Sequence, residues 1–576
     1  MGTHRSGNGA YRVARLAQTS IFPSLTTLSM VRPVNTPIYA LGDFHMLTRR
    51  TLLASSAASL AAPAIIQGAH AATPKGVAVM AKQIDDVVSF DPAESYEFTN
   101  GEVDANCYRR LIRPNLDDAT KIDGDLAEKW EVSKDGLTFT FHLRKGVVFD
   151  SGKPLTAHDA AFSLQRVVKL NKTPGFIITQ FGFTPDNVEK LVTAPDDYTL
   201  EMKLPAAQAT SFVLYCLTAN VGSVVDKATA LANQTNGDLG NAWLKTRTAG
   251  AGPYKLTEWA ASDHVIIDAN PHAGEKGIMK RIVLRHVADP SAQLLMLQKG
   301  DADIARDLLA DQLKSISGNK NFTISAAGQG TSLYIAMNQS MPELAKPEVH
   351  QAIKWAIDYE AIAKNITPDT WSVCQSFLPD ALPGAIKDNP FERNVGKAKT
   401  LLIQAGLPDG FAVSMDYISQ APYADIAQAV QANLAAIGIK VTLQPGEQKQ
   451  VITKTRARQH QLAMLVWGTD YFDPNSNAQA WCENPDDSDT SKLKILAWRS
   501  HFVDKELNNE ALAAVQELDP ARRIALYKTM QMQFMDRAPF AMLLQKNAVA
   551  VLGKGVSGFK VGAMPDYTHY SKINKT

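Results

Sequence analysis

The chain has 576 residues, of which 45% are hydrophobic and 20% charged, a composition typical of folded globular proteins and not of disordered or fibrous ones. That length exceeds what one ordinary hydrophobic core supports, so we expect two or more domains. The formal net charge is +1, but residues 1–71 carry six Arg and one Asp, which leaves −4 for the remainder. A mildly acidic remainder argues against nucleic-acid binding.

The first informative segment begins at Met46 and has the parts of a signal peptide. Arg49 and Arg50 form a basic start, an apolar stretch follows over residues 52–66, and Ala-His-Ala at residues 69–71 offers small residues for cleavage. A membrane anchor is the alternative, but the apolar stretch is shorter than the roughly 20 residues that span a bilayer. We therefore expect an exported, periplasmic protein.

The signal peptide is predicted over residues 46–72, and residues 1–45 are interpreted as an upstream extension with the true start at Met46. The Thr-Arg-Arg-x-Leu-Leu pattern at residues 48–53 resembles a twin-arginine export signal, with an ordinary secretory signal as the alternative. No Cys lies at the cleavage site, so no lipid anchor is expected.

Residues 130–143 predict a β-hairpin, because Asp135-Gly136 separates two stretches of alternating residues. Its buried face would hold Leu137, Phe139, Phe141 and Leu143. Thr156 then predicts the start of a helix, with Asp159 three residues later in a variant capping box. Residues 198–204 alternate as a further strand.

Strands and helices alternate through the rest of the chain. Strands are expected over residues 264–268, 281–287, 411–417, 439–443, 462–467 and 539–552. Helices are expected over residues 291–299, 349–361, 397–405 and 426–437, with Gly300, Gly406 and Gly438 as stops. This alternation predicts a parallel or mixed sheet covered by helices. We expect two unlike α/β lobes, the second beginning near residue 333.

Catalytic machinery is missing from the sequence. No GxSxG, GxxxxGK[ST], HExxH or GxGxxG motif is present, and no two of the twelve His have the spacing of a metal pair on one element. His142 and His264 fall in predicted strands as ordinary strand residues. A secreted hydrolase or chaperone-like protein stays the rival class, and a binding protein is favoured.

Four cysteines, Cys107, Cys216, Cys374 and Cys482, lie far apart and form no CxxC motif. Zinc or redox chemistry is therefore not expected. An oxidising compartment permits disulfides, with three full pairings open, and buried free thiols are the equal alternative.

One segment, residues 467–475, stands out as a binding candidate. It follows the apolar strand at residues 462–466, and ligands of α/β folds bind beyond the carboxyl ends of strands. Carboxylates among aromatic residues suit a cationic or amine-bearing solute. The candidates are Trp467, Asp470, Tyr471 and Asp473. The alternative is that Trp467 belongs to the core and that Asp473, before Pro474, forms a turn.

Two further segments are candidate pocket walls. The loop at residues 95–100 combines Tyr96 and Phe98 with small polar residues, although ordinary loop packing explains it equally well. Tyr417, followed by Ser419 and Gln420, ends a predicted strand and faces a possible cleft.

Several blocks in order resemble the solute-binding proteins of dipeptide and oligopeptide ABC importers, the extracellular family 5 class. The resemblance runs from about residue 75 to the end of the chain. The blocks are LAEKWEVSKDGLTF (126–139), LRKGVVF (143–149), FDSGKPLTAHD (149–159), GAGPY (250–254), LQKGDAD (297–303), YIAMN (334–338), VHQAI (349–353) and GIKV (438–441).

The resemblance implies a two-lobed periplasmic binding protein fold with a hinged ligand cleft. Lobe I would cover residues 73–332 and include an extra subdomain, lobe II residues 333–538, and residues 539–576 would return to lobe I. The implied function is capture of a peptide or other amine-bearing solute and its delivery to the permease subunits of an ABC importer. The expected protein is a monomer that needs no cofactor or metal.

The resemblance also assigns roles to residues. An Asp in the Trp-Gly-x-Asp stretch, here Asp470, would pair with the amino group of a peptide. Dipeptide binders often carry an Arg in the stretch that corresponds to residues 419–428, and this chain has none there. That departure leaves sugars, opines and metal chelates, which other members of the class bind, as alternative solutes.

Overall fold

The computed structural model describes residues 73–115, 118–274 and 278–576, so the predicted upstream extension (1–45) and signal peptide (46–72) lie outside the described residues. Among the described residues, no helix is long and apolar enough to cross a membrane. The four cysteines are all buried free thiols, which confirms that alternative over disulfide bridges.

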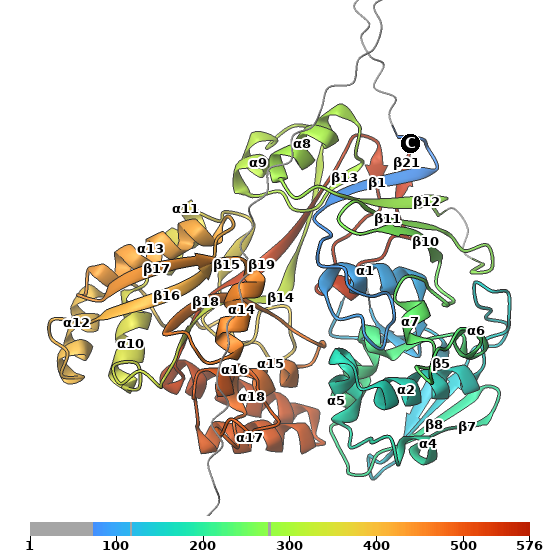
Figure 1. Ribbon diagram of the computed structural model, residues 1–576, viewed down its shortest axis with the longest axis horizontal. Coiled ribbons are helices and arrows are strands. Elements are labelled where there is room, and N and C mark those ends of the chain that lie inside the picture. Colours follow the sequence, from blue (N-terminus) through green and yellow to red (C-terminus); the bar gives the residue numbers. More distant parts are fainter. Residues whose placement is uncertain (1–72, 116–117, 275–277) are drawn as a thin grey trace, which may run out of the picture. The chain divides into compact units, whose positions relative to one another are not determined.

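A mixed sheet of eleven strands runs through the described chain (Figure 1). Its order is β10-β11-β12-β1-β13-β19-β14-β18-β16-β17, with β15 paired to β19 at the side. Parallel pairs join β1 to β12 and β13, and β16 to β17 and β18, while the other pairs are antiparallel. The mixed α/β sheet expected from the sequence is confirmed.

The strands of this sheet are β1 (Val77–Lys82), β10 (Tyr254–Ala260), β11 (His264–Ala269), β12 (Arg281–His286), β13 (Ile304–Ala305), β14 (Thr323–Met337), β15 (Trp371–Val373), β16 (Ala412–Ile418), β17 (Lys440–Gly446), β18 (Leu462–Gly468) and β19 (Phe540–Leu552). The main helices around it are α8 (Pro290–Lys299), α9 (Ala310–Ser315), α10 (Pro347–Ala356), α11 (Tyr359–Asn365), α12 (Val395–Gln404), α13 (Tyr423–Ala435), α14 (Gln448–Arg456), α15 (Pro474–Cys482), α16 (Leu496–Arg499), α17 (Lys505–Gln516) and α18 (Pro520–Arg537).

A separate four-stranded sheet contains the predicted hairpin. Its order is β5 (Ala127–Val132), β6 (Thr138–Leu143), β8 (Thr199–Lys203) and β7 (Val192–Asp196). Phe139, Phe141 and Leu143 are buried as expected, whereas Leu137 is only half-buried. Helix α2 (Ala157–Leu170) packs on this sheet, and the Asp159 carboxylate accepts hydrogen bonds from the Thr156 amide and hydroxyl. The capping pattern that predicted this helix is confirmed.

One predicted helix is interrupted. The periodicity over residues 349–361 favours one helix, but α10 ends at Ala356 and α11 begins at Tyr359. Asp358 causes the break, because its carboxylate accepts a hydrogen bond from the Ala361 amide and caps the second helix. The prediction of a single helix was wrong because a local cap competes with continued periodicity.

The two faces of the sheet carry different cores. Along β14, Leu333 and Ile335 enter one core with the helices α10, α12 and α13, while Tyr334 and Ala336 enter another with α15, α17 and α18. The last strand, β19, runs beside β14 (Figure 1) and reaches β13, where Leu552 lies opposite Ile304. The lobe boundaries at 332/333 and 538/539 stay predictions.

Helix α1 (Phe98–Cys107) is buried on almost every side although it is rich in polar residues. Each polar side chain therefore needs a partner. Asn100 donates to the Ser95 hydroxyl (2.9 Å), Asp104 accepts from Asn220 (3.0 Å) and Asn106 donates to the Thr568 carbonyl (2.9 Å). Gly250 is required beside this helix, because a Cβ there would lie 2.2 Å from the Cys107 carbonyl oxygen.

Glu102 is the centre of this packing. Its carboxylate accepts from Lys82 of β1 (3.0 Å), from the Arg306 guanidinium that follows β13 (3.1 Å at Nη2), and from the Tyr570 hydroxyl (2.7 Å). The side chain is 1% exposed, yet the two cations lower the pKa of Glu102 to about 2 against the effect of its burial. One carboxylate therefore ties α1 to two strands and to the C-terminal segment.

We predict that Glu102→Gln lowers the free energy of unfolding by about 3–5 kcal/mol at pH 7, because it leaves buried cations without their carboxylate. The folded-state pKa of Glu102 is depressed from 4.5 to about 2. Its contribution is therefore present in full above pH 4.5 and is lost as the pH falls towards 2. Denaturant unfolding at pH 7 and at pH 3 measures the difference. The exposed Glu128→Gln serves as control, and equal losses for both variants at pH 7 would contradict the prediction.

Candidate functional site

Asp470 lies in the loop between β18 and α15, and its backbone is fixed from both sides. The Thr469 amide donates to the Gly330 carbonyl (2.7 Å), and the Thr469 hydroxyl donates to Asn477 (2.9 Å). The Asp470 amide donates to the Ser476 hydroxyl (2.8 Å). The apolar strand thus ends in a rigid loop that presents one carboxylate beyond its carboxyl end, as the strand pattern predicts.

The Asp470 carboxyl is half-buried, and within the described residues its side-chain partner is the Tyr96 hydroxyl, which donates to Oδ1 at 2.5 Å. Its removal from water raises the pKa of Asp470 to about 7, although the Tyr96 hydrogen bond and the nearby Arg499 favour the ionised form. The pKa of the Tyr96 phenol also rises well above its usual value, first through burial and then through Asp470. The site therefore holds a carboxyl whose pKa lies near neutral pH.

One aromatic side chain contacts this carboxyl, and others lie on neighbouring residues of the same two segments. A Cβ at Gly468 would lie 2.6 Å from Cζ of Phe98, so the strand needs glycine where the Phe98 ring crosses it. Phe98 is still 48% exposed. The Tyr96 ring meets Phe176 edge to face at 6.4 Å between centroids. Trp467 is half-buried against Trp481, and its buried indole N–H has no partner among the described residues.

Several charged groups lie near the contact between Tyr96 and Asp470. Glu97, next to Tyr96, has a raised pKa because of burial and of Asp86, while Arg456 at the end of α14 opposes the shift. Arg499, at the end of α16, acts on both Asp470 and Tyr96. Neither arginine was predictable as part of the site, because each lies at the end of an ordinary helix outside the candidate segment.

The other candidates from the sequence lie elsewhere. Asp473 is buried, caps α15 and forms a two-bond ion pair with Arg523 (2.6 and 2.7 Å). Tyr471 is 1% exposed and lies in the core that contains the four-stranded sheet. Tyr417 is 8% exposed and packs in the core with α13. The structure therefore brings Tyr96 to Asp470 and Phe98 to the neighbouring Gly468. Trp467 packs against Trp481, and Asp473, Tyr471 and Tyr417 are buried in the protein interior.

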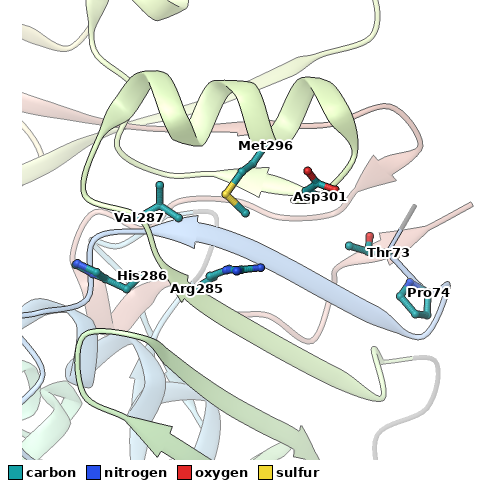
Figure 2. A pocket seen from close by; sticks show the side chains of 7 residues that line it. All are labelled: Thr73, Pro74, Arg285, His286, Val287, Met296 and Asp301. Atoms are coloured by element: carbon teal, nitrogen blue, oxygen red, sulfur yellow. The ribbon is translucent and has the colours of Figure 1, made fainter. Parts of the chain in front are cut away.

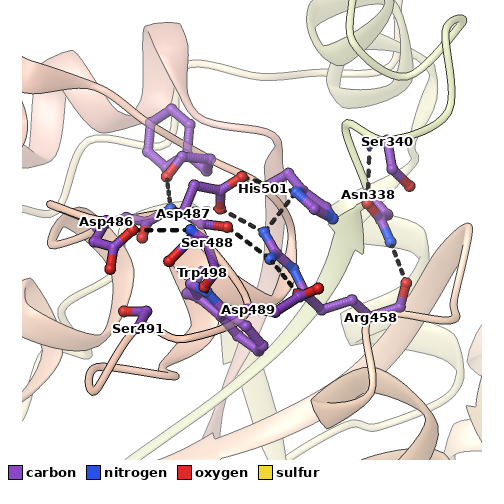
Figure 3. Close-up of polar contacts among 12 residues, drawn as sticks. Asn338, Ser340, Arg458, Asp486, Asp487, Ser488, Asp489, Ser491, Trp498 and His501 are labelled. Carbon is purple, nitrogen blue, oxygen red and sulfur yellow. Dashed lines mark hydrogen bonds and ion pairs between the residues drawn. The ribbon is translucent and has the colours of Figure 1, made fainter. Parts of the chain in front are cut away.

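A polar cluster holds the segment that carries Arg499 (Figure 3). The Arg458 guanidinium donates to the Asp487 carbonyl (2.8 Å), contacts its carboxylate, and stacks 4.1 Å from the centre of the Trp498 ring. His501 Nδ1 lies 2.8 Å from the Asp487 carboxylate. Because Trp498 and His501 flank Arg499 in the chain, this cluster fixes the position of that arginine.

A surface cavity of about 520 Å³ lies between β1, β12 and α8 (Figure 2). Arg285, His286, Met296 and Asp301 line it with Thr73, Pro74 and Val287, and none of them contacts the Asp470 site. It has no aromatic platform other than His286, so it does not match the amine-binding chemistry of the Asp470 site. In the part of the chain that the structure describes, no group of three or more His, Cys, Asp or Glu could hold a metal ion.

Comparisons with known proteins identify the family of the chain. Residues 121–489 match the profile of the bacterial extracellular solute-binding proteins, family 5 Middle. A protein of Escherichia coli (strain K12) described as a probable D,D-dipeptide-binding periplasmic protein, DdpA, is 26% identical over 504 residues, which cover 86% of this chain and 93% of DdpA.

Solved structures give the same fold. The ABC transporter-associated periplasmic binding protein DppA from Helicobacter pylori, in complex with the peptide STSA, has a TM-score of 0.74 at 25% identity and covers 87% of this chain and 98% of that chain. AgaA from A.tumefacien R10, in complex with agropinic acid, has a TM-score of 0.68 at 22% identity, covering 87% and 99%. The fold is thus the two-lobed periplasmic binding protein fold expected from the sequence. The chain belongs to the bacterial extracellular solute-binding proteins of family 5.

Proposed function

We propose that the protein captures a small peptide or another amine-bearing solute in the periplasm and delivers it to the permease subunits of an ABC importer. The observation that carries this proposal is the Asp470 carboxyl, half-buried among aromatic rings with a pKa of about 7. Relatives described as binding D,D-dipeptides and the peptide STSA support a peptide as the solute. AgaA with agropinic acid supports an opine as the alternative.

An ammonium group suits this site better than a neutral sugar does. Ionisation of Asp470 in its partly dehydrated position is unfavourable, and a cation placed beside it recovers that free energy. The rings of Tyr96, Phe98 and Trp467 offer faces to the ammonium and apolar surface to the adjoining atoms. A neutral solute would gain nothing from the charge.

The Tyr96 hydroxyl already binds the carboxylate to which the solute's ammonium would bind. Its hydroxyl donates to Asp470 Oδ1, leaving Oδ2 as the acceptor that the ammonium would use. Tyr96 precedes α1 and Asp470 follows β18, and the two residues are 374 positions apart in the chain. A solute at this position would therefore contact both of these segments. A solute that binds the closed form better than the open form shifts the protein towards closure and towards docking on the permease.

Export by a cleaved signal over residues 46–72, of the twin-arginine type, belongs to the same proposal, as do a monomeric state and the absence of catalysis. A rival hydrolase would change the mass of a bound solute with time. Native mass spectrometry of the protein purified gently from a periplasmic extract tests the class of solute and its turnover together.

We predict that Asp470→Asn weakens binding of the retained amine-bearing solute by roughly 10- to 100-fold, the loss expected for a charge-assisted hydrogen bond of about 1.5–3 kcal/mol. Isothermal titration measures it. The exposed Asp311→Asn controls for the change of net charge. Because the empty site disfavours an ionised Asp470, the variant's melting temperature at pH 8 should not fall below that of the wild type. Unchanged affinity in Asp470→Asn would remove Asp470 from the site.

We also predict that affinity falls as the pH is lowered from 7.5 to 5. A cation binds the ionised carboxyl, whose pKa in the empty site is about 7, so binding must release the proton that Asp470 holds below that pH. Well below pH 7 the affinity should drop about tenfold per pH unit. Over this range Tyr96 stays a neutral phenol and Arg499 stays positively charged, so neither changes its protonation state beside Asp470. Titration in buffers of different ionisation enthalpy counts the protons released, and an equally steep profile in Asp470→Asn would contradict this assignment.

A further inference from the structure

The four-stranded sheet belongs to a subdomain that also contains α2, α3 (Phe176–Thr179) and α5 (Thr210–Thr218) and has a core of its own. Among the described residues, the buried members of this core lie between Ala93 and Ala251, with the single exception of Tyr471. Tyr471 is 1% exposed and directly follows Asp470 in the chain. The neighbour of the candidate binding residue is therefore anchored in the subdomain.

Aromatic packing and hydrogen bonds hold Tyr471 in that place. Its ring meets Phe212 of α5 edge to face, with 5.9 Å between the ring centroids. Its hydroxyl donates to Oε1 of Gln180 at the end of α3 (3.4 Å) and accepts from Nδ2 of Asn475 in α15 (3.2 Å). Phe472, the next residue, enters the other core, with α15, α17 and α18. This short segment therefore bridges two packed cores, and packed cores resist displacement.

Helix α5 also holds the loop further along. The Arg523 guanidinium, which binds the Asp473 carboxylate through two bonds, donates from Nη1 to the Ser211 hydroxyl at 3.1 Å. Just before α5, the Ala209 amide donates to the Val515 carbonyl at 2.8 Å. Two of the three residues that follow Asp470 are therefore tied to α5, one directly and one through Arg523.

The subdomain supports the partner of Asp470 as well. The Tyr96 ring meets Phe176, the first residue of α3, edge to face at 6.4 Å between centroids. Helices α3 and α5 contact each other. Together they present the α3–α5 face, which consists of Phe176, Gln180, Ser211 and Phe212. Tyr96 and Asp470 are 374 positions apart and share a 2.5 Å hydrogen bond, and this one face supports both of their segments.

We propose that the α3–α5 face positions Asp470 and Tyr96 for the solute, with Tyr471 and Phe212 as positioning residues that do not touch the solute themselves. Each of these two side chains is 1% exposed. The inference rests on the proposed function for the role of Asp470, and it gives the subdomain a part in solute binding. Loosening this face would let water reach the Asp470 carboxyl and would misplace it, and small misplacements of a functional group are costly.

The first readout of the test needs no solute. In protein labelled with ¹³C at the aspartate carboxyl carbons, the signal that is absent from Asp470→Asn reports the pKa of Asp470, which is about 7 in the wild type. Tyr471→Leu and Phe212→Leu should lower this pKa by about one unit, because a hydrated carboxyl ionises more readily. Tyr471→Phe keeps the ring and should restore the wild-type pKa.

The second readout is the affinity for two probes, L-Ala-L-Ala and D-Ala-D-Ala, measured by isothermal titration. Tyr471→Leu and Phe212→Leu should weaken the binding of the preferred dipeptide about tenfold, and Tyr471→Phe less than about twofold. A wild type that binds neither dipeptide would overturn the peptide part of the proposed function. The pKa readout would then still decide the role of the α3–α5 face.

The matched control is Phe139→Leu, the same substitution in the same core but on β6, where the described residues show no ring contact with Tyr471. It should cost about as much stability as Phe212→Leu and leave both readouts at wild-type values. Equal changes in Phe139→Leu and Phe212→Leu would overturn the inference, because the effect would then follow the stability of the subdomain alone. Wild-type readouts in Phe212→Leu would overturn it directly.

Phe176→Leu tests the same face from the side of Tyr96. Phe176 is half-buried, so this variant spares the core and remains informative where Tyr471→Leu or Phe212→Leu fails to fold. It should lower the pKa of Asp470 and weaken dipeptide binding in the same direction as the core variants. An unchanged pKa together with unchanged affinity in Phe176→Leu would contradict the positioning role.

Discussion

The ion cluster around Glu102 is the constraint on which the rest of the site depends. Helix α1 is surrounded by protein, and its polar side chains stay buried only because each has a partner. Glu102 takes its partners from β1, from the residue after β13 and from Tyr570 near the C-terminus. These segments come from the beginning, the middle and the end of the described chain, so the position of α1 depends on contacts with all three. The loop before α1, which carries Tyr96, is positioned by the same contacts.

The long sheet connects this region to the second half of the chain through its paired strands. Strand β19 pairs with β13 near Leu552 and with β14 along most of its length, while β14 also pairs with β18. The strands that leave the neighbourhood of Glu102 are therefore the strands that hold the Asp470 loop. The ladder between β14 and β19 is broken between Gly328 and Ser332. A break in a ladder between two paired strands is a natural place for bending, and the amide of Thr469, next to Asp470, donates to Gly330 within it.

Local patterns predicted most of the elements and part of the site. The hairpin at Asp135-Gly136, the helix that begins after Thr156 and the helix that stops at Gly300 were predictable, because turn residues and caps act over a few positions. The break at Asp358 was missed because capping competed with periodicity. The contact of Tyr96 with Asp470 spans 374 residues, and no local pattern contains such a pairing.

Asp470 and Asp473 show why residue type alone did not separate binding from structure. The two carboxylates are three residues apart, and both lie between β18 and α15. Asp473 has the N-terminus of the helix and the guanidinium of Arg523, so its charge is fully compensated inside the protein. Asp470 has one phenol hydrogen bond and a more distant arginine, and its pKa stays near 7. A charge that is paired inside the protein stabilises the fold and is not available to a solute. An unpaired charge destabilises the protein without solute, and the binding of a cation recovers that free energy.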